Sequence, residues 1–156
     1  MSFDRIKSSA GWVNPRALPK GPNGKNLCRQ CGIEVSGRRQ TFCSDECVDN
    51  WRITTSPAFV REKLLRRDHG ICCQCGFDAE MIQRRLKSLI RHKPQNYQII
   101  LSLYGIVQTM WSWKPNPFES LWQAHHIIPV AKGGGECDLG NYETLCLWCH
   151  RCRHKK

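Results

Sequence analysis

The sequence predicts an α+β fold in which short strands and helices form a small core behind a cysteine-rich module. Length is the first observation, since 156 residues make one domain, or one domain with a small appendage. Cysteine spacing is the second, because the eleven cysteines include four pairs separated by two or three residues. The third is a pattern of strand, glycine-rich loop, strand and helix near the end of the chain.

Composition favours an anionic partner and bound metal. Lys and Arg number 24 against 13 Asp and Glu, so the net charge of +11 favours nucleic acid, while 40% hydrophobic residues argue against disorder. The longest mainly apolar segment, Ile99 to Val107, is far shorter than the roughly 20 residues that cross a bilayer. The N-terminus also lacks an apolar signal region. We therefore expect an intracellular protein (cytoplasm, nucleoid or nucleus) with no membrane partner, whose reduced thiols bind metal.

A zinc finger is expected over residues 25–55, after a flexible basic arm over residues 1–24 that is rich in Gly, Ser and Pro. Four thiolates on two turns are a ligand set for one tetrahedral zinc ion. The predicted ligands are Cys28, Cys31, Cys43 and Cys47. Free thiols or disulfides are the alternative, and the spacing argues against them.

Local signals place further elements around this finger. Residues 32–42 are interpreted as two short strands about a Ser36-Gly37 turn. Ser44 can cap a helix over residues 45–53. A second helix is expected to begin at Pro57 and to end with Asp68, and its basic side chains are expected to stay mostly in water.

The remaining residues, 56–156, are expected to form one domain with a helical insertion at about 77–118. Apolar residues recur at helical spacing over residues 79–90, and residues 97–107 form a further apolar segment. Three tryptophans either stack on bases or pack inside the insertion, and packing is favoured because aromatic rings beside apolar helices are usually buried. They are Trp111, Trp113 and Trp122.

A second set of zinc ligands is split between the middle and the end of the chain. A shared ion would close a long loop and stabilise a site that local propensity alone would not. The favoured ligands are Cys72, Cys75, Cys146 and Cys149. They are favoured because they bracket a turn that opens the last helix, although Cys149 and Cys152 also have a knuckle spacing and Cys73 is the neighbour of Cys72. The cysteines left over are Cys73, Cys137 and Cys152.

Between these cysteines lies the segment richest in side chains that can bind metal or transfer protons. His125 and His126 precede Ile-Ile-Pro, and a glycine-rich loop leads to Asn141 and to the last cysteine pair. His150 and His154 then share one face of the final helix, because residues four apart are neighbours on a helix. Adjacent residues of a strand point to opposite faces, so His125 and His126 can border one phosphate only at a strand end or a bulge.

This order of residues resembles the HNH endonuclease family, whose ββα-metal motif combines paired His or acidic residues, a glycine-rich loop, Asn and Leu-Cys-x2-Cys-His. The match runs from Gln123 to His154, with Cys72 to Gly76 as the upstream zinc half. The Cys28 to Cys47 finger also resembles longer members, including the nuclease domain found on some annealing helicases. The resemblance implies a zinc-stapled ββα-metal core, DNA as substrate, and a helicase-like or other protein as partner.

The resemblance also implies roles for single residues. His126 would be the general base that activates water, and Asn141 would hold it in its productive orientation. His125 and His150 would bind one catalytic divalent metal (Mg²⁺, Mn²⁺, Ni²⁺ or Zn²⁺), beside the two structural Zn²⁺ ions. His154 would be an extra ligand or a phosphate contact. Many members carry Asp where this chain has His125, and a neutral nitrogen ligand favours transition ions over magnesium.

Basic residues close the chain and flank the expected phosphate site, where they would position the backbone without reading bases. They are Arg151, Arg153, Lys155 and Lys156. The expected function is a metal-dependent DNA endonuclease that nicks or cuts phosphodiester bonds with strong salt dependence. Two alternatives stay open at this point. One is a non-catalytic zinc module that binds DNA or a helicase-like partner, and the other is an RNA-directed nuclease.

Overall fold

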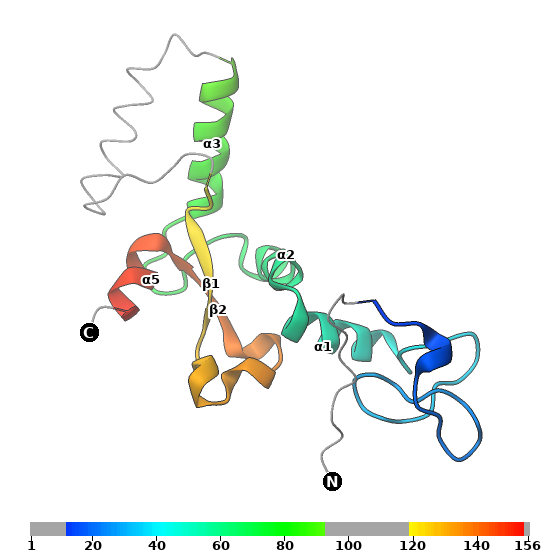
Figure 1. Cartoon of the computed structure of the whole chain (residues 1–156). Helices are drawn as coiled ribbons and strands as arrows, with labels where there is room; N and C mark the ends of the chain where they lie inside the picture. Colours follow the sequence, from blue (N-terminus) through cyan, green and yellow to red (C-terminus); the bar gives the residue numbers. More distant parts are fainter. Residues whose placement is uncertain (1–11, 93–118, 155–156) are drawn as a thin grey trace. The chain divides into compact units, whose positions relative to one another are not determined.

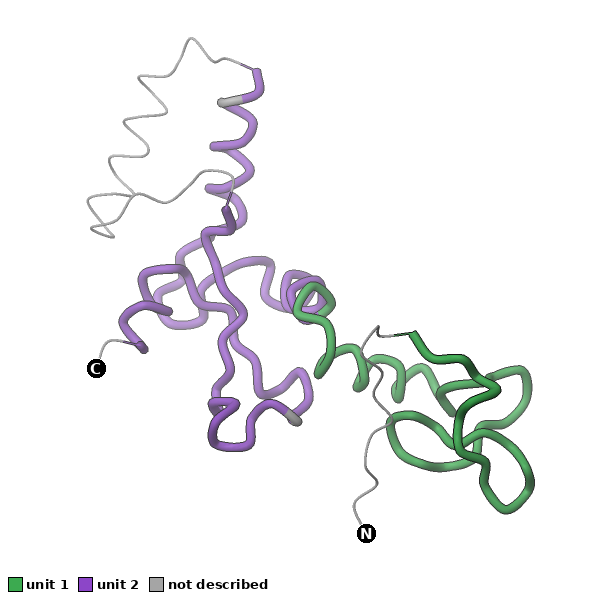
Figure 2. The backbone as a smooth tube through the Cα atoms, viewed as in Figure 1, with its two compact units in different colours: residues 1–59 green, residues 60–156 purple. Residues whose placement is uncertain are grey.

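A computed structural model describes residues 12–92 and 119–154 of the chain. The chain divides into two compact units, residues 1–59 and 60–156, which are coloured separately in Figure 2. Within the described residues, no helix is both long and apolar enough to cross a membrane. The predicted domain boundaries at residues 25, 56 and 77–118 remain predictions.

The first unit is built on α1 (Asp45–Thr55), which corresponds to the helix predicted over residues 45–53 (Figure 1). The side chain of Ser44 caps it by accepting a hydrogen bond from the backbone N–H of Cys47 at 3.1 Å. Trp51 and Ile53 on this helix are buried. The cap therefore fixes the first turn of α1, and with it the position of Cys47, a candidate zinc ligand.

The prediction of two strands over residues 32–42 is wrong. The described backbone there forms a single bridge, between Leu27 and Glu34, and Gly37 occupies the left-handed region at φ 63°. Backbone groups of this segment bond the cysteine turn before it instead, since the carbonyl of Ile33 accepts from the N–H of Cys28 and the N–H of Gly32 donates to the carbonyl of Cys28. A tight turn around sulfur leaves too little extended chain for a hairpin.

Part of the segment expected to be a flexible arm is hydrogen-bonded to the finger. Asn26 donates from its side-chain amide to the carbonyls of Pro15 and Gln40, at 2.9 Å each. The N–H of Leu27 donates to the carbonyl of Pro19, and Leu18 is only 4% exposed. Residues 12–24 therefore pack in the first unit, and residues 1–11 lie outside the described part.

In the second unit, α2 (Pro57–Asp68, whose first residues belong to the first unit) and α3 (Ala79–His92) match the predicted helices. The basic side chains of α2 are not all solvated as expected. Arg61 stacks 4.1 Å from the ring of Trp122, and Arg67 donates to the carbonyls of Leu139 and Tyr142. These guanidinium groups tie α2 to the first residue of each strand and to the turn before β2, where backbone carbonyls accept their N–H groups.

The predicted packing role of Trp122 is confirmed, since its side chain is 3% exposed. Its indole Nε1 donates to Glu80 on α3 at 3.4 Å, and Gln83 of α3 bonds the backbone of Leu121 just before it. These contacts dock α3 against the start of the sheet. The segment 97–107, Trp111 and Trp113 lie outside the described residues.

The sheet is one antiparallel pair, β1 (Trp122–His126) and β2 (Tyr142–Cys146), followed directly by α5 (Leu147–His154) (Figure 1). The register is continuous, with Trp122 opposite Cys146 and His126 opposite Tyr142. β1 therefore ends at His126, and the Ile-Ile-Pro segment that follows lies outside the strand. The strand, loop, strand and helix order confirms the predicted α+β class.

Candidate metal centre and active site

The first cysteine group lies within the first unit. Its four sulfurs lie within 4.8 Å of one another, as expected for Cys28, Cys31, Cys43 and Cys47. The Cys31 and Cys43 sulfurs are 3.5 Å apart, and those of Cys43 and Cys47 are 3.4 Å apart. Tetrahedral zinc with Zn–S bonds of about 2.3 Å separates its sulfurs by about 3.8 Å. The group fits a zinc finger.

The second group joins distant parts of the second unit. It contains Cys72, Cys75, Cys146 and Cys149. The sulfurs of Cys75 and Cys146 are 3.7 Å apart, and the N–H of Cys149 donates to the sulfur of Cys146 at 3.5 Å. Neither Cys73 nor Cys152 is part of this group, and both are exposed. The structure thus brings together the favoured set and leaves the alternative partners outside.

The thiols of both groups are suited to a cation. Burial alone would raise the pKa of Cys72, but backbone N–H donors around it lower that pKa to about 7. Burial also raises the pKa of Cys146 to about 11, and the charge of Cys72 adds to the increase. One thiolate forms readily while its neighbour resists ionisation. A bound Zn²⁺ would offset the shared negative charge and keep all the sulfurs ionised.

Three histidines converge where α5 crosses the end of the sheet. Ring nitrogens of His125, His150 and His154 lie within 4.8 Å of one another. The ring centroid of His125 is 5.3 Å from that of His150 and 5.2 Å from that of His154. Three imidazoles at this spacing fit one divalent transition ion with open positions for other ligands. His154, for which two roles were expected, thus joins the other two rings.

Electrostatics keep two of these rings neutral. Burial lowers the pKa of His125 and of His150, and the charge of Glu143 partly opposes this for His125. A neutral imidazole offers the lone pair that a metal needs, whereas a protonated one does not. The environment therefore favours the metal-binding form.

His126 lies apart from this group. It is the last residue of β1, its register partner is Tyr142, and the two rings are 4.2 Å apart. His125 and His126 were expected to border one phosphate only at a bulge or at a strand end. The pairing of β1 with β2 is continuous and has no bulge, so the strand end is the arrangement present. His126 is half-buried and follows a metal-ligand candidate directly in the chain.

Asn141 is buried and holds the loop after β1 in place. Its Oδ1 accepts from the N–H of Ile128 at 2.8 Å, and its Nδ2 donates to the carbonyls of Ile128 and Gly134 at 3.1 and 2.9 Å. A Cβ on Gly134 would lie 1.7 Å from the Ile128 carbonyl oxygen, so only glycine fits there. In the described residues Asn141 contacts loop backbone and not the His126 ring. Any effect on His126 passes through the loop.

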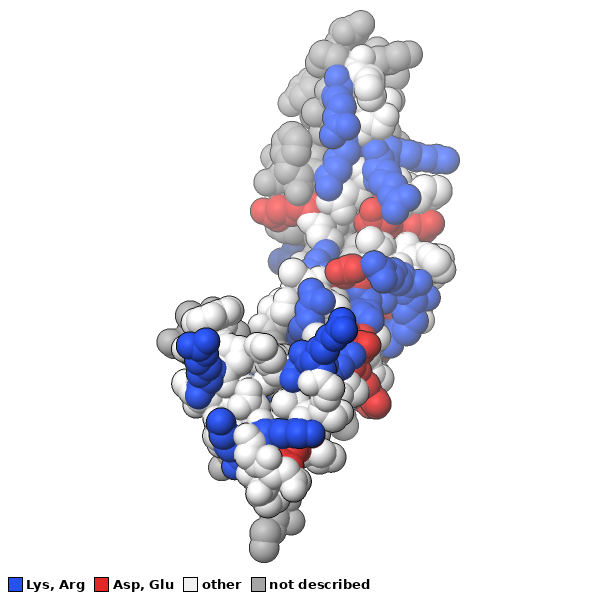
Figure 3. All heavy atoms as spheres, turned by 90° about the vertical axis from the view of Figure 1, so that its right-hand side faces the viewer, with Lys and Arg blue, Asp and Glu red and all other residues white. Residues whose placement is uncertain are grey.

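The expected nucleic-acid contacts are only partly described. Arg151 and Arg153 are exposed on α5, while Lys155 and Lys156 lie outside the described residues. Arg153 forms an ion pair with Glu143 at 3.4 Å and donates to Gln74 at 3.3 Å. On the face drawn in Figure 3, basic side chains are more prominent than acidic ones, as the charge of +11 requires.

Glu143 is a neighbour of the site that sequence reasoning missed. It lies directly opposite His125 in the strand pair, and one of its carboxylate oxygens is buried without a hydrogen bond. Side chains alternate between the two faces of residues 142–146, but this pattern places Glu143 on the same face as His125 only when the pairing register of the two strands is known.

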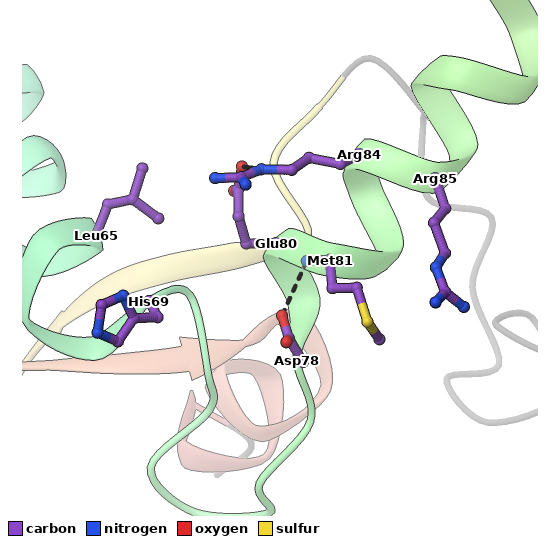
Figure 4. Close-up of a pocket in the computed structure, with 7 residues that line it drawn as sticks. All are labelled: Leu65, His69, Asp78, Glu80, Met81, Arg84 and Arg85. Carbon is purple, nitrogen blue, oxygen red and sulfur yellow. Dashed lines mark hydrogen bonds and ion pairs between the residues drawn. The ribbon is translucent and has the colours of Figure 1, made fainter.

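A cavity of about 360 Å³ lies at the start of α3 (Figure 4). Its two acidic residues have partners, since Asp78 accepts from the N–H of Met81 at 2.8 Å and Glu80 pairs with Arg84 at 2.9 Å. The lining residues are Leu65, His69, Asp78, Glu80, Met81, Arg84 and Arg85. None of them belongs to the metal-ligand groups.

Comparison with known proteins identifies a family and relatives of this chain. Residues 113–156 match the model of the HNH endonuclease family. The DNA annealing helicase and endonuclease ZRANB3 of Mus musculus is 30% identical over 148 residues, and that of Homo sapiens is 31% identical over 140 residues. Each match covers 82% of this chain and 13% of the relative, so the chain spans about an eighth of these proteins. No solved structure matches the chain.

The matched segment contains both strands, the glycine-rich loop, Asn141 and α5. The matches to ZRANB3 extend over most of the remaining chain. The C-terminal part of this chain is therefore a member of the HNH endonuclease family.

Proposed function

We propose that the chain is a metal-dependent endonuclease that hydrolyses phosphodiester bonds in DNA. The observation that carries this proposal is the convergence of three imidazoles, those of His125, His150 and His154, next to His126 at the end of β1. A binding module has no need for a metal-ligand group beside a half-buried fourth imidazole. A phosphodiesterase needs both, because charge on the phosphate and proton transfer from water must be handled together.

In this mechanism His126 is the general base. Its ring accepts a proton from a water molecule whose oxygen attacks the phosphorus, the bond from phosphorus to the 3′-oxygen breaks, and the departing 3′-oxygen takes up a proton from solvent. The products are a 5′-phosphate and a 3′-hydroxyl end. The ring of Tyr142, 8% exposed, supports the His126 ring from one side. Asn141 contributes indirectly by fixing the backbone of Ile128, two residues after the base.

The metal ligands in this proposal are His125, His150 and His154, whose neutral nitrogens fit a divalent ion. When bound, that cation supplies positive charge beside the scissile phosphate and the leaving 3′-oxygen. Three nitrogen donors favour Mn²⁺, Ni²⁺ or Zn²⁺ over Mg²⁺, which prefers oxygen ligands. The two cysteine groups would hold structural Zn²⁺ only.

DNA is the proposed substrate, and Arg151 and Arg153 would contact its phosphates. We further propose residues 25–55 as the finger and residues 56–156 as the nuclease domain, with the insertion at 77–118. The ZRANB3 relatives are named as annealing helicases as well as endonucleases, which supports a helicase-like protein as a partner. Nonspecific phosphate contacts imply binding that weakens steeply with salt.

Plasmid nicking in the presence of Mg²⁺, Mn²⁺, Ni²⁺ or Zn²⁺ tests the proposal. We expect His126→Ala to slow nicking by about 10²- to 10⁴-fold, the usual contribution of a general base. The matched control is His92→Ala, because His92 is an exposed histidine on α3 away from the candidate site. Equal rates for His126→Ala and the parent would remove the base assignment.

The same preparations separate the alternatives. A non-catalytic zinc module would bind DNA in a salt-sensitive way and show no metal-stimulated nicking in any variant. An RNA-directed nuclease would cut RNA in preference when duplex DNA, single strands and RNA compete. We expect duplex or single-stranded DNA to be cut in this competition.

A further inference from the structure

Glu143 shares a face of the sheet with the proposed metal ligands. It is the register partner of His125 in the antiparallel pair, and directly opposed side chains on one face have Cβ atoms about 5 Å apart. The His125 ring in turn lies against the rings of His150 and His154 from α5. The carboxylate is thus next to the histidine group although it comes from a different strand.

The hydrogen bonding of this carboxylate is incomplete. Its Oε2 accepts from the thiol of Cys73 at 3.2 Å, but its Oε1 is buried and has no hydrogen-bond partner. Oε1 forms an ion pair with Arg153, with an N–O distance of 3.4 Å. That side chain is 46% exposed and also bonds Gln74, whereas the Glu143 side chain is only 17% exposed. An ion pair at 3.4 Å with a largely solvated guanidinium compensates only part of the cost of burying the Glu143 carboxylate.

A carboxylate next to the histidine group would offset the positive charge of nearby arginine side chains. Imidazole ligands carry no negative charge, and α5 places Arg151 and Arg153 on the same short helix as two of the three histidines. A divalent cation there would be repelled by these guanidinium groups. A buried carboxylate on the His125 face offsets that repulsion, because charges interact more strongly where water is excluded.

We propose that Glu143 is a positioning residue of the metal centre, whose carboxylate offsets the charge of the divalent cation held by His125, His150 and His154. The proposal rests on the function proposed above. It assigns Glu143 neither contact with the substrate nor a proton-transfer step. Its effect is on metal affinity, and changes in groups around a metal site typically alter affinity by about 10- to 100-fold.

Cobalt binding tests this without measuring activity. The full chain, with both cysteine groups loaded with zinc, is titrated with Co²⁺ and followed by the visible absorption of the bound ion. We expect Glu143→Gln, which keeps the shape and removes the charge, to weaken Co²⁺ binding about 10- to 100-fold. The control is Glu62→Gln, since Glu62 is an exposed acid on α2 that pairs with Arg66. It should bind Co²⁺ as the parent does.

A second variant gives an effect of opposite sign. Arg153→Gln removes the competing cation from Glu143, so it should strengthen Co²⁺ binding if the carboxylate serves the metal. If Glu143 only anchors Arg153 and α5, Arg153→Gln should instead weaken Co²⁺ binding as Glu143→Gln does. Unchanged affinity in Glu143→Gln, or weaker binding in Arg153→Gln, overturns the proposal.

The outcome also distinguishes this inference from the proposed function. His150→Ala removes one proposed ligand and should abolish the Co²⁺ signal. If His150→Ala titrates like the parent, the histidine group is not the metal site, and the proposed function loses its basis. If His150→Ala loses Co²⁺ and Glu143→Gln does not, the metal site stands and only the role of Glu143 is wrong. Two zinc ions per chain in every variant show that the fold is intact.

Discussion

The two cysteine groups contain the same four donors but connect very different lengths of chain. In the first group all ligands lie within residues 28–47, so an ion there would order one local turn and the start of α1. The second group joins residues 72–75 to residues 146–149, and Cys149 directly precedes His150. The local group supports a finger, whereas the split group also sets where a proposed catalytic-metal ligand lies.

This difference has an energetic side. Closing a longer loop removes more entropy from the unfolded chain, although the increase with length is slow. A structural zinc ion is worth on the order of 10–16 kcal/mol in apparent binding free energy, which equals or exceeds the stability of a typical domain. Either group can therefore hold its own unit folded. Only the split group couples that stability to the histidine centre.

The largest expected effect comes from breaking one ligand in each group. Cys146→Ser should abolish both nicking and Co²⁺ binding, because the turn that leads to His150 loses its anchor. Cys43→Ser should lose one zinc ion yet keep Co²⁺ binding at the histidines. Zinc content, circular dichroism and Co²⁺ titration measure these outcomes. Loss of the Co²⁺ site in Cys43→Ser would show that the two units depend on each other.

A medium effect is expected from the loop asparagines, which are counterparts in the two units. Asn141→Ala removes three side-chain hydrogen bonds of a buried group, and we expect it to destabilise the second unit by about 2–4 kcal/mol and to slow nicking. Asn26→Ala loses two comparable bonds in the first unit and should leave the nicking rate nearly unchanged. Denaturant unfolding and nicking at saturating DNA measure both. Equal nicking by Asn141→Ala and the parent would argue that the loop does not position His126.

The smallest effect concerns pH and is confined to the second unit. Hydrogen bonds from Arg67, and another from Thr144 at 2.6 Å, lower the pKa of Asp68. A lowered carboxyl pKa adds stability that is complete above the ordinary Asp pKa of about 3.9 and is lost as pH falls through the folded-state pKa. Asp68→Asn should therefore cost about 1–3 kcal/mol near pH 7.

The stability difference between Asp68→Asn and the parent should stay constant down to about pH 5 and shrink only below about pH 4. Urea unfolding with excess zinc at several pH values measures this difference. A difference that grows in acid would contradict the sign derived from the Asp68 contacts. Because Asp68 and Thr144 both lie in the second unit, zinc binding at Cys28 to Cys47 should not change.

Much of the local structure could be predicted because its causes are local. Ser44 and Pro57 are helix-start signals and correctly predicted two helices. Cysteines separated by two or three residues meet on one turn, and His150 and His154 share a helix face because they are four residues apart. The prediction of a hairpin over residues 32–42 was wrong because backbone groups of Gly32 and Ile33 bond Cys28 and are not available for strand pairing.

The amino-acid sequence by itself determined the α+β class, the two cysteine groups and the candidate histidines, since each depends on residue type and short-range spacing. Only the tertiary structure decided that Arg61 and Arg67 hold α2 to the sheet, that Asn141 bonds the loop, and that Glu143 faces His125. These contacts depend on strand register and on packing between segments far apart in the chain. A period of two residues says which side chains share a face, and only the folded sheet says what lies opposite them.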